Sequence, residues 1–572
     1  MNASNGNKLN ISGDLKSRQW GFASFLVLAF LLPWHSSSPA ALSDPPQLPG
    51  KTEAPVAVDA LLLAIQSLLG EMGLYHGALD GRMSKSTQEA IRLHQKAWNL
   101  KQNGLPSEDL LQHLEMVAGM RRIERRLKQT KAEQITGAKR LIEESPATRR
   151  LLLEAAARPQ PSVESPQSCF DEPRPECLAI LARQAALAAP VGSMRDWALS
   201  EVASEAAEAG VPLMAWEVAS RIDDPRTLIA ALGSVARALA EGGNFQAALE
   251  ALEAIPDTAR RCEAALNLAQ RQAEAGKHEG ARAARNLAVQ MLDSLKMPEE
   301  ILAARLKLAE VALLLGEGGA ASRWRLEAEQ RLLSLPVDAR QGAMASLSMI
   351  ETSLKRFDAS RQWLLQVQDG LLRVPAELKL IEAMALAGRG GEAETLADYI
   401  EAPRYRVLAQ VRLAAAKIKL GDNAEAKRHL REAGTQVSAI DLPFAKAYGE
   451  SQIALAWQAL GESETAEAMA RVIEDEAIKA HTLWRLSDVV PLGRRDILRI
   501  EAELATKAHA DPFGRVWMYA ELVRERSRQG DKAGALAHLA RGLTVAEAIS
   551  DSWSRSRALA ALAGAMAEMQ RP

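Results

Sequence analysis

The sequence predicts an all-α protein in which a small three-helix module precedes a long array of helical hairpins. Three observations predict this class: alanine is abundant, aromatic residues are rare, and one motif recurs along two thirds of the chain. Alanine accounts for 104 of the 572 residues, whereas Phe, Trp and Tyr together number 24. Alanine is the best helix former and lets neighbouring helices approach closely. The composition therefore favours packed helices and excludes a β-sandwich or barrel.

The charges of the chain nearly cancel, which bears on its partners. There are 70 Lys and Arg residues against 72 Asp and Glu residues, a formal net charge of −2. Nucleic-acid-binding domains are usually strongly basic, so we expect no nucleic-acid partner. Hydrophobic residues make up 48% of the chain, which is enough to form buried cores.

Residues 1–40 are predicted to be a signal peptide or, as the alternative, an uncleaved anchor. Three basic residues precede a run without charge from Trp20 to Trp34. This run is shorter than the about 20 residues that a relaxed membrane span needs. Ser38 and Ala40 place small residues before a cleavage point, as signal peptides do. We therefore expect an exported protein that meets a membrane only through this segment, if the segment is not cleaved.

A proline-rich spacer at 41–56 leads into a compact module at 57–115. Apolar residues at helical spacing predict a first helix that ends near Gly73, and glycine and aspartate residues at 77–81 predict a turn. Thr87 is expected to cap the second helix. A third helix is expected at 107–114.

This order of helices and turns resembles the peptidoglycan-binding-like domain, a three-helix module of bacterial cell-wall enzymes and envelope proteins. The residues that carry the resemblance are Ile65, Gln66, Leu69, Gly73, Tyr75, Gly77, Asp80, Gly81, Thr87, Ala90, Ile91, Gln95, Leu100 and Gly104. The chain departs from the family at Ser84, where a glycine is usual, at His94, where an aromatic residue is usual, and at Asn103, where an aspartate is common. The resemblance implies peptidoglycan as the ligand and the periplasm, with or without an inner-membrane anchor, as the location.

The glycine-rich turn is the candidate ligand site of the module. Backbone donors and an aspartate there would meet a glycan or peptide, and Tyr75 would offer a stacking face. The candidate residues are Tyr75, Gly77, Asp80, Gly81, Thr87 and Gln95. As the alternative, the same residues only make the turn and cap the helix. We expect no cofactor and no metal, because His76, His94 and His113 are far apart in the sequence and lack partners at ligand spacing.

Residues 116–158 are predicted to be a basic helical connector, and residues 159–177 a proline-rich linker. From 121 to 158 there are 11 Lys and Arg residues against 5 Glu residues, so the connector either meets an anionic surface or presents a solvated face. Cys169 and Cys177 lie close enough in the linker to form a disulfide in an oxidising compartment; two free thiols are the alternative. Cys262 lies in a helical pattern and is expected to be a small buried residue.

Residues 178–572 are predicted to form an α-solenoid of roughly ten hairpins. The repeated frame is a proline, a glycine eighteen positions later and an alanine five positions after that. Its clear copies are Pro225/Gly243/Ala248, Pro298/Gly316/Ala321, Pro403/Gly421/Ala426, Pro443/Gly461/Ala466 and Pro512/Gly530/Ala535. Looser copies include Gly210/Ala215, Pro256/Gly276/Ala281, Pro336 before Arg356, Pro375 before Gly388/Ala393, and Asp475 before Gly493. Proline suits the first turn of a helix, glycine ends it in the left-handed conformation, and alanine lets the next helix pack closely.

The interval between glycine and alanine resembles that of the tetratricopeptide repeat, although aromatic residues are fewer and several units are longer than in that family. The resemblance implies an elongated body whose surface binds other proteins. The candidate partner-binding residues are Trp324, Trp363, Trp457, Trp484 and Trp517. Because Trp at helical spacing is usually part of a core, we expect only one or two of them to serve in binding.

The sequence favours a protein that is not an enzyme. It has no HExxH, GxxxxGK[ST], GxGxxG or GxSxG motif, and its histidines are all widely separated from one another. The leading hypothesis is a scaffold of a bacterial cell envelope that docks on peptidoglycan and holds envelope proteins of unknown identity. The alternatives are a regulatory or targeting subunit of a cell-wall hydrolase or synthase, and an assembly factor whose module has lost glycan binding.

Overall fold

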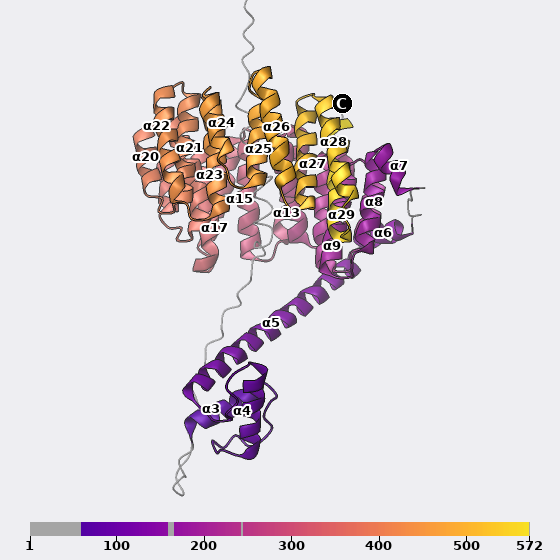
Figure 1. The fold of residues 1–572 in the computed structure, drawn as a ribbon, viewed down its shortest axis with the longest axis vertical. Helices are drawn as coiled ribbons and strands as arrows, with labels where there is room; N and C mark the ends of the chain where they lie inside the picture. Colours follow the sequence, from indigo (N-terminus) through magenta and orange to yellow (C-terminus); the bar gives the residue numbers. More distant parts are fainter. Residues whose placement is uncertain (1–58, 158–164, 242–243, 571–572) are drawn as a thin grey trace, which may run out of the picture. The chain divides into compact units, whose positions relative to one another are not determined.

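The computed structural model describes residues 59–157, 165–241 and 244–570 (Figure 1). Within them it has 27 α-helices and no strand, so the predicted all-α class is confirmed. The predicted signal segment and the whole spacer that follows it lie outside the described residues. Among the helices that the structure describes, none combines the length and the apolar character that a membrane span requires. The chain divides into two compact units at residues 136 and 137.

Unit 1 packs three helices around one small core. They are α3 (Ala60–Glu71), α4 (Lys85–Ala97) and the first part of α5 (Glu108–Glu144). The core includes Ile65, Leu69, Tyr75, Ile91 and Leu114. Helix α5 begins after Ser107, whose Oγ accepts a hydrogen bond from the backbone N–H of Leu110 at 3.1 Å. It runs far past residue 114, where we expected it to end, because no proline interrupts the chain before Pro146.

Unit 2 begins with helices in the region predicted as connector and linker. They are α6 (Pro146–Ala156), α7 (Pro166–Asp171) and α8 (Pro175–Ala188), and each begins with a proline, which suits a first turn. Helix α6 packs on α10, and the buried hydroxyl of Thr148 donates to the carbonyl of Ala254 at 2.7 Å. The end of the predicted connector is therefore part of the core of unit 2.

Ten helical hairpins follow in sequence, each made of a first and a second helix. They are α9 (Ser193–Glu208) with α10 (Pro212–Ala219), α11 (Pro225–Glu241) with α12 (Phe245–Glu253), α13 (Thr258–Glu274) with α14 (His278–Met291), α15 (Pro298–Leu314) with α16 (Gly318–Leu332), α17 (Val337–Ser353) with α18 (Phe357–Leu364), α19 (Gly370–Leu386) with α20 (Gly390–Asp398), α21 (Pro403–Lys419) with α22 (Asn423–Gln436), α23 (Pro443–Ala459) with α24 (Ser463–Arg471), α25 (Glu476–Ser487) with α26 (Leu492–Ala508), and α27 (Pro512–Arg528) with α28 (Lys532–Glu547). Short 3₁₀ turns, Leu292–Ser294 and Val437–Ala439, end two of the second helices.

The repeated frame has the structural role that we predicted. Its five prolines are the first residues of α11, α15, α21, α23 and α27. The turn glycines have φ between +73° and +87°; they are Gly210, Gly276, Gly316, Gly388, Gly421, Gly461 and Gly530. Gly243 lies outside the described residues. The alanines that follow the five frame glycines are fully buried between helices. The first helices are uniform in length: eight of the ten have 17 residues, including all five that begin with a frame proline.

Three of the looser copies differ from the prediction. Lys355 has φ +60° and takes the place of the turn glycine before Arg356. Pro375 lies inside α19, which already begins at Gly370, and not in its first turn. Gly493 lies in α26 and makes no turn, because α25 ends early at Ser487 and Pro491 cannot continue it.

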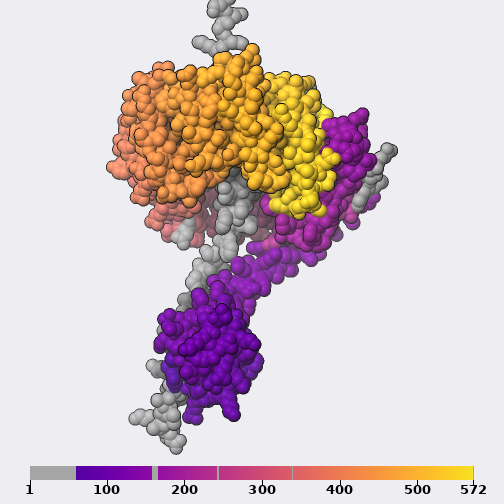
Figure 2. Space-filling view, viewed as in Figure 1, coloured from indigo at the N-terminus to yellow at the C-terminus, as the bar shows by residue number. Residues whose placement is uncertain are grey.

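The array closes on itself, so the expectation of an elongated body is wrong. The last helix, α29 (Ser552–Gln570), packs against α27, α8 and α9. Figure 1 shows yellow α29 beside purple α8 and α9, and Figure 2 shows the two surfaces meeting. Helix α29 packs against α8 as the first helix of a hairpin packs against its second helix. The last helix of unit 2 and a helix from its beginning thus pair as an eleventh hairpin.

The sequence of α29 explains why it closes the array. All residues from Ser556 to Ala567 are buried, and from Ala558 to Ala567 none of them is polar. A helix that is apolar on every side is stable only when it is surrounded by protein. One hydrophobic core accordingly runs from Ala138 to Leu315 and includes residues from Val516 to Met566.

Candidate functional site

Gln66 on α3 holds the glycine-rich turn of unit 1 in place. Its side chain is fully buried, and its Oε1 accepts hydrogen bonds from the backbone N–H groups of Asp80 at 3.1 Å and Gly81 at 2.9 Å. Its Nε2 donates to the carbonyl of Arg82 at 2.9 Å and to Oδ1 of Asp80 at 3.2 Å. Gly81 completes the turn with φ +65°. The Gln66 amide therefore bonds both N–H and carbonyl groups of the turn, which restricts the conformations of the loop.

Tyr75 belongs to the core and does not offer the stacking face that we expected. It is only 6% exposed, and its hydroxyl donates to the carbonyl of Ala78 at 2.8 Å. A Cβ atom at Gly77 would lie 2.5 Å from the Tyr75 hydroxyl oxygen, so the chain can pass the ring only as glycine. Both residues therefore shape the loop.

Ser84 is the cap of α4. The prediction that Thr87 caps this helix is wrong. The Ser84 Oγ accepts a hydrogen bond from the backbone N–H of Thr87 at 3.0 Å. Thr87 lies in the first turn of the helix, fully buried, with its Oγ1 within 3.3 Å of the Gln66 amide nitrogen. Sequence reasoning missed this because it treated Ser84 only as a departure from the family pattern, whereas serine is itself a strong capping residue.

Gln95 braces the next loop in the same way. It is 5% exposed; its Nε2 donates to Oδ1 of Asn103 at 2.8 Å, and its Oε1 accepts from the backbone N–H of Gly104 at 2.9 Å. Asn103 supplies the acceptor that an aspartate would supply. The polar groups of Gln95 are thus used within the fold.

Asp80 remains exposed on the loop at 76–83, where Gly77 is exposed as well. Hydrogen bonds from the backbone N–H of Arg82 and from the Gln66 amide lower the pKa of its carboxyl group, so it is ionised at neutral pH. Of the six candidate residues, Asp80 is the one charged side chain that faces solvent. The exposed loop can therefore offer a ligand a fixed carboxylate and backbone groups.

Two histidines that are distant in sequence meet in unit 1. Nε2 of His94 and Nδ1 of His113 are 2.9 Å apart, and the exposed ring of Trp98 lies against both. Burial, reinforced by His113 and Arg121, lowers the pKa of His94 to about 4. Sequence distance alone did not predict this contact, because each residue lies on a different helix.

Part of the positive charge of the connector is used within unit 1. Arg122 and Arg125 of α5 both bind the carboxylate of Glu71 at the end of α3, with Arg125 at 2.9 Å. The hydrogen bond from Arg122 is the main cause that lowers the pKa of Glu71. Arg121 donates to the carbonyl of Met72 at 3.1 Å. These residues attach α5 to α3, which the charge count of the sequence did not reveal.

The five candidate tryptophans of the array all pack on hydrophobic clusters. Trp457 and Trp484 are buried, and Trp324, Trp363 and Trp517 are half-buried. All five tryptophans therefore contribute to packing, and none of them is freely exposed. An exposed tryptophan that we did not select, Trp197 on α9, lies at the closure of the array and is 46% exposed.

The structure joins Cys169 and Cys177 in a disulfide, with Cα atoms 5.6 Å apart. This bond ties α7 to the start of α8. Cys262 is buried, as predicted, and burial raises the pKa of its thiol to about 11, which makes it unreactive.

One group of possible metal ligands occurs among the described residues: Glu394, Glu425 and His429. Arg428 already lies among them, 2.9 Å from Glu394 and 2.7 Å from Glu425. His429 is also held from its other nitrogen, which lies 2.7 Å from Oε1 of Gln410. The guanidinium group thus supplies the positive charge there.

Comparison with known proteins identifies no family. No family model matches the chain, and no curated protein matches it. Solved structures that are similar in part include the following two. The crystal structure of Ton1535 from Thermococcus onnurineus NA1 is 14% identical, with a TM-score of 0.27, over 55% of this chain and 96% of that one. A circular tandem repeat protein with novel repeat topology and enhanced subunit contact surfaces is 14% identical, with a TM-score of 0.18, over 89% of this chain and 97% of that one. With TM-scores this low, neither similarity bears on the function.

Proposed function

We propose that the protein is a scaffold of a bacterial cell envelope and not an enzyme. In this proposal the exposed loop at 76–83 of unit 1 binds peptidoglycan, and the hairpins of unit 2 bind partner proteins. The observation that carries it is the loop itself: buried Gln66 fixes its backbone while the carboxylate of Asp80 faces solvent. A binding loop that is already ordered loses little conformational freedom when its ligand arrives.

The resemblance of unit 1 to the peptidoglycan-binding-like domain supports the choice of ligand. Peptidoglycan offers sugar hydroxyls, amides and ammonium groups, all of which can donate to a carboxylate. Because Tyr75 is buried, the proposal assigns binding to Asp80 and to the exposed backbone of the loop, without ring stacking.

The closed array supports a role in holding other proteins. Helical hairpin repeats commonly present extended surfaces to protein partners, and these hairpins resemble tetratricopeptide repeats in their glycine and alanine interval. Closure through α29 adds rigidity, since neither end of the array is free. Export to the periplasm accords with the charge-free run from Trp20 to Trp34 and with the Cys169–Cys177 disulfide.

Sedimentation with insoluble peptidoglycan tests the first half of the proposal. The purified chain should pellet with the polymer, and Asp80→Asn should weaken this binding, because asparagine keeps the Oδ1 acceptor of the loop and loses only the charge. Asp293→Asn, which changes an exposed aspartate of unit 2, is the matched control and should pellet like the wild type. Wild-type protein that stays in the supernatant would contradict peptidoglycan binding.

A second function has a specific observation in its favour. Tyr75, Thr87 and Gln95 use their polar groups within unit 1, which is the arrangement expected of an assembly factor whose module no longer binds glycan. Crosslinking in cells distinguishes the possibilities. Recovery of a cell-wall hydrolase or synthase as the main partner indicates a targeting subunit, whereas partners without wall binding indicate the assembly factor.

A further inference from the structure

The hairpin of α25 and α26 differs from its neighbours and leaves a cavity beside α27 and α28. Helix α25 has 12 residues, whereas most first helices have 17. The backbones of α25 and α27 approach each other less closely than the backbones of the other pairs of adjacent first helices. The cavity has a volume of about 350 Å³. It is open to solvent and is lined by residues of both hairpins.

The walls of this cavity carry more positive than negative charge. The cations are Arg499, Lys507, Arg526 and Arg541, and the carboxylates are Glu503 and Asp531. Both carboxylates are already engaged: Glu503 accepts from the Tyr519 hydroxyl at 2.9 Å and pairs with Arg541 at 3.3 Å, while Asp531 caps α28. Glu503 also pairs with Lys507 at 3.5 Å, and Asp531 lies 4.0 Å from Arg499, so these two carboxylates balance part of the charge of the four cations.

Two guanidinium groups keep buried N–H groups unused. Arg526 is 3% exposed; it pairs with Asp488 and donates through Nη1 to Gln529 at 3.2 Å, but its buried Nη2 has no hydrogen-bond partner among the described residues. The buried Nε of Arg499 likewise has none. Because these N–H groups have no acceptor, the positive charge of both guanidinium groups is only partly compensated.

The effect of this charge is visible at His538, which also lines the cavity. Burial is the main cause that lowers its pKa to about 3, and the charges of Arg541, Arg526 and Arg499 contribute to this shift. Burial and Arg526 lower the pKa of Arg499 as well. A negative charge between these groups would relieve the repulsion.

An exposed apolar face adjoins the cavity on α26. Ile497, Ile500 and Leu504 are 54%, 63% and 62% exposed and lie on one side of the helix, at intervals of three and four residues. Ile500 and Leu504 also line the cavity, together with Trp484. A cationic cavity next to an apolar ridge matches a ligand that is anionic in one part and apolar in the next.

We infer that this cavity and the α26 face bind a polypeptide segment of a partner protein in which a carboxylate side chain lies next to apolar side chains. The carboxylate pairs with the cationic groups that line the cavity, Arg499 among them, and the apolar side chains cover Ile497, Ile500 and Leu504. A peptide suits the site better than a small anion because the apolar face continues along α26 outside the cavity. The inference rests on the proposed function, since it names the surface and the partner chemistry for the protein-binding half.

Fluorescence anisotropy with the full chain tests the inference. The probe is a fluorescein-labelled helical peptide of Glu, Leu and Ala, and its counterpart has Gln in place of every Glu. The Glu peptide should bind about tenfold more tightly, because a charged hydrogen bond contributes more than a neutral one. Arg499→Gln and Ile500→Ser should each weaken its binding about tenfold. Arg323→Gln and Leu365→Ser, at exposed positions elsewhere, should leave binding unchanged, and circular dichroism should show all variants folded.

Three outcomes overturn the inference: equal binding of the two peptides, binding that Arg499→Gln and Ile500→Ser leave unchanged, or a dimer in sedimentation velocity that Ile500→Ser dissociates. In the last case a second copy of this chain covers the face. Crosslinks from cellular partners to other helices of unit 2 would contradict this surface and leave the proposed function intact. Loss of peptidoglycan binding in the pelleting assay would instead concern unit 1 alone.

Discussion

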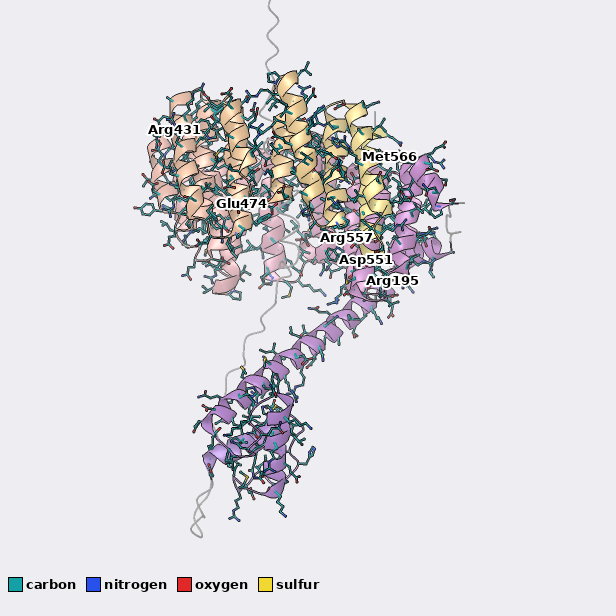
Figure 3. All side chains as sticks on the ribbon, in the orientation of Figure 1. Arg195, Arg431, Glu474, Asp551, Arg557 and Met566 are labelled. Carbon is teal, nitrogen blue, oxygen red and sulfur yellow. A yellow bond between two sulfur atoms is a disulfide. The ribbon has the colours of Figure 1, made fainter. Side chains whose placement is uncertain are left out.

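Buried Arg557 on α29 forms an ion pair with half-buried Glu201 on α9, although 356 residues separate them in sequence. Its Nη2 lies 3.0 Å from Oε1 of Glu201, and its side chain is 2% exposed. The rings of Trp197, Phe513 and Trp553 surround the guanidinium, with centroids 4.4 to 4.6 Å from its central carbon. Figure 3 labels Arg557 on yellow α29, close to the start of the array. One side chain of α29 thus contacts α9 of the first hairpin and α27 of the last one.

Arg557→Gln is expected to lower the stability of unit 2 by about 1–3 kcal/mol, because it removes a charged hydrogen bond and the contacts of the guanidinium with the three rings, while Glu201 stays partly exposed to solvent. The urea midpoint of unfolding measures this. Arg323→Gln, an exposed arginine on α16, is the control and should shift the midpoint little. An unchanged midpoint for Arg557→Gln would show that the closure does not depend on this pair.

Gly564 of α29 marks a close approach between the two ends of unit 2. A Cβ atom there would collide with the carboxylate of Glu205, which also pairs with Arg524 at 3.1 Å. Gly564→Ala should therefore destabilise unit 2 by about 1–3 kcal/mol, the usual cost of overpacking. Gly434→Ala is the opposite case, because Gly434 lies in α22 with open space around it. This substitution should raise the stability of unit 2 by about 0.5–1 kcal/mol. Thermal unfolding of both variants checks the difference in sign.

The recurring frame predicted most of unit 2, because its proline, glycine and alanine act locally. Each sets one helix start, one turn or one close contact, as at Pro403, Gly421 and Ala426. Closure was not predicted, because the partners of α29 include helices at the opposite end of the array. The spacing of residues within a repeat gives no information about contacts between such distant helices. The apolar run from Ala558 to Ala567 was the available signal: no side of that helix is suited to solvent.

Lys355 occupies a left-handed position that seven other hairpin turns give to glycine, so Lys355→Gly should stabilise the protein. Its φ is +60°, and a residue with a Cβ atom loses about 1 kcal/mol there. The reciprocal variant is Gly421→Ala, where φ is +77° and no atom lies within 4 Å of the added Cβ, so the loss of about 1 kcal/mol comes from the backbone alone. Opposite shifts in the unfolding midpoint are expected; shifts of the same sign would contradict the role of φ.

The loop of unit 1 was predicted less completely than the array. The turn at Asp80 and Gly81 followed from residue types that favour turns, and the structure has it. The bonds that hold it come from Gln66, 14 residues earlier, and a buried glutamine looks the same in sequence as an exposed one. For the same reason Tyr75 was expected at the surface and lies in the core.

His94 makes the stability of unit 1 depend on pH. Its side chain is fully buried, and its Nδ1 is a buried atom without a hydrogen-bond partner in the described part of the chain. Burial lowers the pKa of the folded state to about 4, whereas the unfolded state titrates near 6.5. Between these values the unfolded chain binds the proton more readily than the folded one.

Stability should therefore be greatest above pH 6.5 and should fall as the pH drops towards about 4, by up to about 3 kcal/mol. His94→Phe should remove this part of the dependence, because phenylalanine fills the buried position without a titrating group. Calorimetry of the transition of unit 1 between pH 7.5 and 4.5 measures the slope, and His278→Phe, on α14 of unit 2, is the control that should leave it unchanged. An NMR titration in which the His94 ring protonates near pH 6.5 would contradict the prediction, because the pKa in the folded state would then equal that of the unfolded chain and no dependence would follow.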